Sequence, residues 1–158
     1  MPINTKIPAG KRREKGIVNA VKLIFTFFYF AILFYLVFFI GRRRIGYPFD
    51  VNLVPVRNNW NNFKYIAEIG GFNYFSNIFG NVLLFIPLPV ILKMYLKVYK
   101  FSIVLLVAIL LSITIESLQY ILKVGVADID DVILNSIGAC VGYYFIFLSK
   151  KTLGSFIS

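Results

Sequence analysis

The sequence predicts an all-α fold: an integral membrane bundle of four transmembrane helices with a long first extracytoplasmic loop. Of the 158 residues, 59% are hydrophobic and only 15% are charged, and the mean hydropathy is +0.78. A water-soluble domain cannot bury so much apolar surface, so the chain needs the lipid bilayer as its solvent. Four long apolar runs follow one another, and Lys22 is the one basic residue inside a run.

Composition also excludes several classes of function. The formal net charge of +10 sits at the chain ends and between the apolar runs, as in proteins that meet anionic lipid headgroups. Nucleic acid is not an expected partner, because it would need a basic face on a soluble fold. The absence of histidine excludes Ser-His-Asp and Cys-His catalysis and every His-ligated metal site. The single cysteine, Cys140, forms no intrachain disulfide.

The first apolar run covers residues 17–40 and follows a basic segment, residues 1–16, that we expect to be a flexible cytoplasmic tail. A helix of this length spans about 36 Å, enough to cross a bilayer. No small-residue cleavage site follows the run, so we interpret it as a retained helix rather than a signal peptide. The second run, residues 75–92, contains Pro87 and Pro89, which predict a bend near Pro87.

The loop between these runs, from Gly41 to Tyr74, is rich in asparagine and aromatic residues. Trp60, Phe63 and Ala67 recur at helical spacing, which favours a short helix lying on the membrane surface. The same residues are equally consistent with an ordinary aromatic belt at the membrane boundary. The sequence leaves both interpretations open.

The third run covers residues 101–122 and the fourth residues 129–148, which completes a membrane domain over residues 17–148. Gly138 and Gly142 in the fourth run form a small-xxx-small pattern and predict close contact with another helix. Residues 149–158 form a short second tail. With the N-terminus inside, ten Lys and Arg residues lie on the inner side and six on the outer side. This count favours two cytoplasmic termini. The arginines Arg42 to Arg44, directly after the first helix, favour the opposite orientation.

Polar side chains gather near one end of the predicted bundle. Asn81, Glu116 and Asn135 come from three different runs, and each lies about 9 Å inside the end of its own helix. We therefore expect these three residues to meet at one level and to form a polar pocket below the outer membrane boundary. The candidate ligand-binding residues, together with their neighbours on the same faces, are Asn52, Asn77, Asn81, Glu116, Gln119, Asp131 and Asn135.

Glu116 is the least favourable of these residues to place in the membrane, because inserting a carboxylate at this depth costs about 3 kcal/mol of free energy. Asn81, Gln119 and Asn135 are the expected hydrogen-bond donors to Glu116, and protonation of the carboxyl is the alternative. Two interpretations of the group remain: the polar side chains tie three helices together, or they bind a polar ligand.

Three acidic residues, Asp128, Asp130 and Asp131, surround the start of the fourth run. Asp128 as the N-cap of a helix explains one of them. Because three carboxylates repel one another, the others suggest a divalent cation as cofactor, or a basic partner such as Lys123.

Four motifs in this order resemble the VanZ-like family over roughly residues 48–148. They are Asn52-Leu-Val-Pro55, Asn77-Ile-Phe-Gly-Asn81-Val-Leu-Leu-Phe-Ile-Pro87, Glu116-Ser-Leu-Gln119, and Asp128-Ile-Asp-Asp131-Val-Ile-Leu-Asn135-Ser-Ile-Gly138. The resemblance places the conserved positions of the family on Asn52, Pro55, Asn81, Pro87, Glu116, Gln119, Asp131, Asn135 and Gly138.

The resemblance implies a bacterial cytoplasmic-membrane protein linked to resistance to the glycopeptide teicoplanin, by a mechanism that is not established. Two positions depart from the family pattern. Pro89 stands where the family commonly has glycine, and Gly125 stands where it commonly has arginine. If that arginine pairs with an acid or an anionic ligand, Lys123 must replace it here.

Three hypotheses of function follow. In the first, the pocket handles an envelope lipid precursor or alters how glycopeptides reach their target, with the net positive first loop attracting phosphate. In the second, the protein is a metal-dependent hydrolase or transferase acting on a lipid-linked substrate, with the aspartates holding the cation and Glu116 as general base. In the third, the chain is a structural membrane protein that binds a partner, and its polar groups only join helices.

Overall fold

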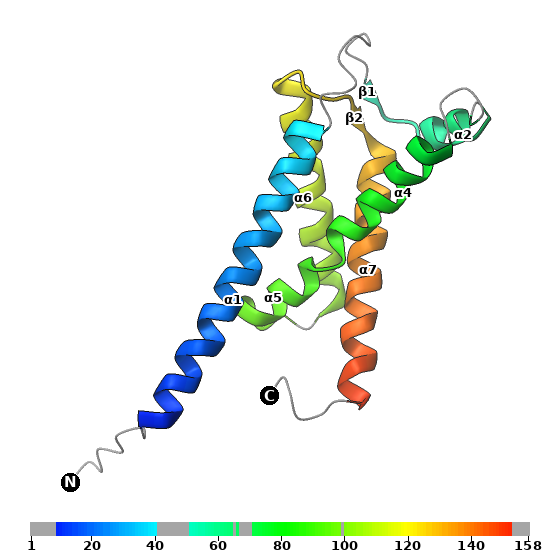
Figure 1. Ribbon diagram of the computed structural model, residues 1–158. Helices are drawn as coiled ribbons and strands as arrows, with labels where there is room; N and C mark the ends of the chain where they lie inside the picture. The colour runs from blue at the N-terminus through cyan, green and yellow to red at the C-terminus, as the bar shows by residue number, and fades with distance from the viewer. Residues whose placement is uncertain (1–8, 41–50, 65, 67–70, 99, 153–158) are drawn as a thin grey trace.

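The structure is a computed structural model that describes residues 9–40, 51–64, 66, 71–98 and 100–152. Four helical segments in these ranges are long and apolar enough to cross a membrane: Gly10–Phe39, Tyr74–Leu96, Phe101–Ile121 and Ile129–Ser149. The predicted fold class, an all-α membrane bundle, is confirmed. The first helix begins, and the last helix ends, at the same end of the molecule (Figure 1), as an even number of spans requires.

The elements, in chain order, are α1 (Ala9–Tyr35), the π-helical turn η1 (Leu36–Ile40), β1 (Val51–Asn52), α2 (Arg57–Lys64), α4 (Gly71–Phe85), α5 (Leu88–Leu96), α6 (Phe101–Ile121), β2 (Ala127–Asp128) and α7 (Ile129–Thr152). Two helices are longer than predicted. Residues 9–16, assigned above to a flexible tail, form the start of α1, and residues 149–152 continue α7. Lysine and arginine are good helix formers, so the basic flanks extend the apolar helices rather than end them.

The second span is broken into α4 and α5 by a turn at residues 86–87. Pro87 has no N–H to continue the ladder of α4, and the N–H groups of Val90 and Ile91 both donate to the Pro87 carbonyl, at 3.1 and 3.2 Å. The predicted bend near Pro87 is confirmed. Helix α5 then ends at Lys97, whose φ of 52° is the left-handed conformation common at helix C-termini.

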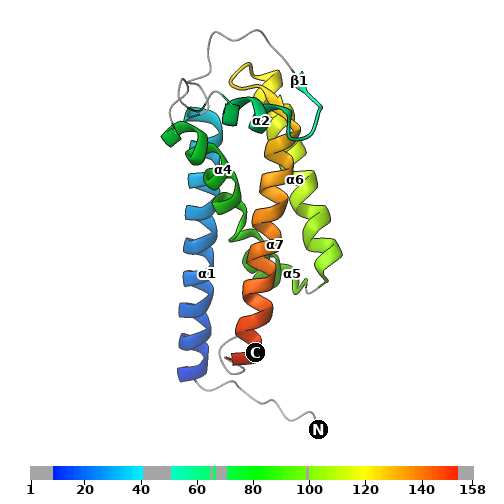
Figure 2. The same ribbon diagram turned by 90° about the vertical axis from the view of Figure 1, so that its right-hand side faces the viewer.

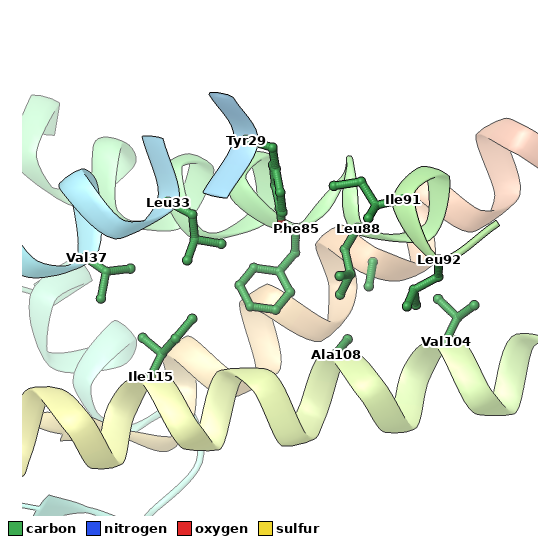
Figure 3. Close-up of a cluster of buried hydrophobic side chains, with 11 residues drawn as sticks. Tyr29, Leu33, Val37, Phe85, Leu88, Ile91, Leu92, Val104, Ala108 and Ile115 are labelled. Atoms are coloured by element: carbon green, nitrogen blue, oxygen red, sulfur yellow. The ribbon is translucent and has the colours of Figure 1, made fainter. Parts of the chain in front are cut away.

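The apolar core runs along the middle of the bundle (Figure 3). Tyr29, Leu33 and Val37 recur every four residues and form the buried stripe of α1 and η1. Phe85, only 1% exposed, points from the end of α4 toward α6. Most of the other large apolar side chains of α1 are exposed, as expected for a helix that meets lipid on most of its surface.

Helices α4 and α7 cross each other (Figures 1 and 2), and two glycines of α7 lie where the second span comes closest to it. A Cβ atom at Gly138 would lie 2.1 Å from the Val82 carbonyl oxygen, and one at Gly142 would lie 2.1 Å from the Ile86 carbonyl oxygen. Any side chain at either position would collide with backbone. The close contact predicted from the small-xxx-small pattern is confirmed, and its partner is α4.

A short parallel strand pair joins the first loop to the start of α7. Val51 pairs with Ala127 and Asn52 with Asp128. Residues 51–56, which we call the strap, thereby run across the end of the bundle at the N-terminus of α7, and β1 lies beside β2 in Figure 1. The sequence analysis predicted no strands. Two residues are too short for an alternating apolar pattern, so no such signal was present.

Candidate polar site at one end of the bundle

Buried and half-buried polar side chains collect where the strap, α4, α6 and α7 meet, at the upper end of the bundle in Figure 1. Each is joined by a hydrogen bond to another segment of the chain. We call this set the polar cluster, and its members are Asn52, Asn77, Asn81, Ser112, Glu116, Asp128, Asp130, Asp131 and Asn135. Six of these nine residues are among the candidate ligand-binding residues named above.

Asp128 lies at the centre of the contacts between the strap and α7. Its Oδ1 accepts a hydrogen bond from the backbone N–H of Asp130, at 3.0 Å, which makes Asp128 the N-cap that the sequence predicts. The same oxygen accepts from Asn52 Nδ2 at 2.7 Å. Asp128 is therefore fixed by two donors, one from its own helix and one from the first loop.

Asp131 accepts hydrogen bonds from two asparagines of α4. Asn81 Nδ2 donates to Asp131 Oδ1 at 2.7 Å, and Asn77 Nδ2 reaches the same oxygen at 3.5 Å. The two asparagines share a face of α4 because they are four residues apart. Their shared contact with one carboxylate holds the start of α7 against α4.

Glu116 is buried, as expected, but its hydrogen bonds differ from the prediction. Its Oε2 accepts from the backbone N–H of Asp128 at 2.9 Å. Gln119, one of the three expected donors, turns instead to η1, where its Nε2 donates to the Val37 carbonyl at 3.0 Å. The carbonyls at a helix end lack intrahelical partners, so this bond satisfies one of them and joins the first span to α6.

Asn135 lies deepest in the polar cluster and is only 3% exposed. Its Nδ2 donates to Ser112 Oγ on α6 at 2.7 Å. Its Oδ1 is buried and has no hydrogen-bond partner among the residues that the structure describes. If the amide were rotated by 180°, its NH₂ group would take the position of Oδ1, so one polar end of Asn135 lacks a partner in the described part of the chain in either orientation.

The predicted common level of Asn81, Glu116 and Asn135 requires a correction. Asn81 pairs with Asp131, and Asn135 pairs with Ser112, which lies one turn before Glu116 on α6. Because α6 and α7 run in opposite directions, Glu116 lies near the level of Asp131. Asn135 lies one turn deeper, by about 6 Å.

The three aspartates do not point to a common centre. Asp128 faces Asn52, Asp131 faces α4, and Asp130, 2% exposed, accepts from the backbone N–H of Val56 in the strap. Within the part of the chain that the structure describes, no group of three His, Cys, Asp or Glu side chains is placed to hold a metal ion. The arrangement predicted for a divalent cation at Asp128, Asp130 and Asp131 is thus not found there, because each carboxylate has donors of its own.

The strap is held in an unusual backbone conformation. Val56 has a φ of 66°, which is rare for a β-branched residue. Its N–H contacts Asp130, and the N–H of Val54 donates to Asn52 Oδ1 at 3.3 Å. Asn52 therefore bonds both to the strap, through its oxygen, and to α7, through its nitrogen.

One member of the polar cluster, Ser112, and two backbone groups near it were not predicted from the sequence. Ser112 lies four residues before Glu116 on the same face of α6, so helical spacing could have identified it. The Val56 N–H and the Val37 carbonyl are backbone groups, and no side-chain pattern indicates them. Gly125, where the family commonly has arginine, packs against Gln119, and the nearby Lys123 is exposed.

Comparison with known proteins agrees with the resemblance of the four motifs. The chain is similar to "Protein VanZ" of Enterococcus faecium, with 29% identity over 105 residues, which cover 66% of this chain and 65% of that protein. The chain thus matches slightly less than two thirds of the length of that relative. No solved structure matches the chain. The model of the VanZ/LLP1 family matches residues 25–150, which is most of the sequence. With the four spans and the polar cluster in place, the chain belongs to the VanZ/LLP1 family of membrane proteins.

Proposed function

We propose that this protein acts in the bacterial cell envelope and contributes to glycopeptide resistance of the teicoplanin type. In this proposal the polar cluster binds the headgroup of an envelope lipid precursor at the outer end of the bundle. Membership of the VanZ/LLP1 family and the similarity to the Enterococcus faecium protein VanZ support the link to resistance. The buried polar groups support a binding role.

The observation that carries the binding role is the unpartnered amide oxygen of Asn135. A buried acceptor without a donor costs about 1–3 kcal/mol in water-soluble proteins. The surroundings here are apolar spans, where no bulk water can satisfy it. A group that binds between α6 and α7 and presents an O–H or N–H to this oxygen would remove the cost.

The chemistry of the polar cluster indicates which headgroup fits. The carboxylates of Glu116, Asp128 and Asp131 accept hydrogen bonds, and so would Asn135 Oδ1. Such a set favours a ligand that donates, such as a sugar hydroxyl, an amide or an ammonium group. A bare phosphate would find few donors there. The basic first loop is better suited to attract phosphate, and most of its basic residues lie outside the described ranges.

The test compares two variants in the polar cluster with one control, in a glycopeptide-sensitive bacterial host that the parent protein protects. Glu116→Gln keeps the shape of the side chain and removes its charge, and Asn135→Ala removes the unpartnered oxygen. Thr114→Val is the control, because Thr114 is exposed on α6 and its hydroxyl donates to the Leu110 carbonyl of the same helix. At equal membrane abundance, we expect teicoplanin protection to fall with both variants and to persist in the control. Full protection by both variants would refute the proposal.

A second candidate function is a purely structural one, and the hydrogen bonds favour it directly. Asn81, Asn135 and Gln119 each join two spans, and Asn52 joins the strap to α7. If the polar groups serve only as links between helices, Glu116→Gln and Asn135→Ala lower the abundance of folded protein. Protection per folded molecule is then unchanged. Measuring abundance and protection together separates the two functions.

A further inference from the structure

Aromatic rings form a continuous series from α2 onto the outer surface of α4. Trp60 stacks with Phe63 at 6.2 Å between ring centroids, Phe63 lies 6.3 Å from Tyr74, and the series continues through Phe75 to Phe79. Phe75 and Phe79 are exposed on a spanning helix, so their surroundings are lipid. The exposed faces of Trp60 and Phe63 are thus continuous with a lipid-facing surface.

The position of α2 is fixed at both of its ends. Its first turn is hydrogen-bonded to the strap, because the Trp60 N–H donates to the Val56 carbonyl at 2.8 Å. The N–H of Val56 in turn donates to the Asp130 carboxylate. Its last turn contacts α4 through Phe63 and Tyr74. Helix α2 therefore lies beside the start of α4, at the end of the spans (Figure 1).

A positive charge accompanies the aromatic face of α2. The Nζ of Lys64 lies 5.4 Å from the centroid of the Trp60 ring. Tryptophan is the residue most typical of the boundary between lipid and water, and a lysine beside it suits an anionic headgroup. In water, the rings of Trp60 and Phe63, each 55% exposed, would be in unfavourable contact with the solvent.

We propose that Trp60, Phe63 and Lys64 form a lipid-binding face that seats α2 in the headgroup layer of the leaflet at the polar-cluster end of the bundle. The preferred lipid is anionic, with its phosphate at Lys64 and its acyl chain along Phe75 and Phe79. Helix α2 then lies at the membrane boundary, linked to the polar cluster through Val56 and Asp130. This inference does not depend on a role in resistance.

Trp60 is the one tryptophan of the chain, so its fluorescence reports on α2 alone. The full chain is reconstituted in phosphatidylcholine vesicles with and without phosphatidylglycerol. Some vesicles contain lipids brominated near the headgroup, and others contain lipids brominated near the chain end. We expect blue-shifted emission, stronger quenching by the shallow bromines than by the deep ones, and weak quenching by aqueous iodide. Added phosphatidylglycerol should increase the bromolipid quenching.

Two variants and one control complete the test. Phe63→Ser should lose most of the bromolipid quenching, and Lys64→Gln should lose only its dependence on phosphatidylglycerol. Asn61→Ser is the control, because Asn61 is exposed on α2 beside the aromatic face, and we expect the parent behaviour. Red-shifted emission with full iodide access and no bromolipid quenching would overturn the proposal. Emission shielded from both quenchers, but changed by dilution of the protein in lipid, would overturn it in favour of a second copy of the chain.

Discussion

Gly138 and Gly142 determine how closely α7 approaches α4. At Gly138 the missing Cβ leaves space for the Val82 carbonyl of α4, and at Gly142 it leaves space for the Ile86 carbonyl in the turn after α4. The Ile86 carbonyl loses its usual helical donor at the break, because the N–H groups of Val90 and Ile91 both donate to the Pro87 carbonyl instead. The absence of a side chain at Gly142 leaves room for that carbonyl against the backbone of α7. The glycines thus allow the break in the second span to lie directly against α7.

We predict that Gly138→Ala lowers the free energy of unfolding by about 1–3 kcal/mol, because the new methyl group collides with the backbone of Val82. Thermal unfolding in detergent micelles measures the change. Gly80→Ala is the matched control on α4, since nothing lies within 4 Å of its Cβ position. Its stability should change by less than about 1 kcal/mol. Equal stability of the two variants would show that α4 and α7 do not pack as described.

The bond from Asn81 to Asp131 gives a second test at the scale of single residues. In a double-mutant cycle with Asn81→Ala and Asp131→Ala, we expect a coupling energy between about 0.6 kcal/mol, the average for interhelical hydrogen bonds in membranes, and about 1.7 kcal/mol, the largest such value. The same cycle with Asn77→Ala should give a smaller coupling, because Asn77 reaches Asp131 at 3.5 Å rather than 2.7 Å. Equal couplings would mean that the two asparagines do not differ in their contact with Asp131.

At this scale the sequence identified most polar residues of the cluster but not their partners. Glu116, Asp131 and Asn135 are recognisable because polar side chains in apolar runs are costly and therefore few. The choice of partner depends on the relative height of the helices, which the loops and the strap determine. A backbone donor such as the Asp128 N–H cannot be recognised from residue types, because nearly every residue has one.

At the scale of elements, the strap is the part that organises the polar cluster from outside the bundle. Asn52 and Val56 bring it to Asp128 and Asp130, and its continuation forms α2. The four spans were predictable because lipid imposes both their length and their composition. The strand pair and the π-helical turn were not, because both arise from tertiary contacts between segments far apart in the chain.

We predict that Asn52→Ala releases the strap from α7. The change removes the donor to buried Asp128, and it also removes the acceptor for the Val54 N–H. The loss should cost about 1–3 kcal/mol, because a buried carboxylate loses a partner. Hydrogen exchange should quicken at the backbone amides of residues 127–130. Leu53→Ala is the control, since Leu53 is 74% exposed in the same strap and we expect its exchange to match the parent. Unchanged exchange in Asn52→Ala would contradict the role given to this asparagine.

At the scale of the whole molecule, the polar cluster, the strap and α2 all lie at one end of the bundle, and the beginning of α1 and the end of α7 lie at the other (Figures 1 and 2). This asymmetry means that one end of the protein carries the candidate binding groups. Which side of the membrane that end faces follows from charge rather than from geometry. The count of Lys and Arg favours the cytoplasm for both termini, and hence the outer side for the polar cluster.

We predict that the strap is accessible from outside the cell and that the turn between α5 and α6 is not. The single native cysteine allows a clean test: in a Cys140→Ala background, Leu53→Cys and Lys100→Cys each introduce one exposed thiol, at opposite ends of the bundle. A membrane-impermeant maleimide should label the Leu53→Cys protein in intact cells and the Lys100→Cys protein only after permeabilisation. The parent Cys140→Ala protein should remain unlabelled. The opposite labelling pattern would place the polar cluster in the cytoplasm, where a glycopeptide outside the cell cannot reach it, and the arginines after the first helix would then dominate the topology.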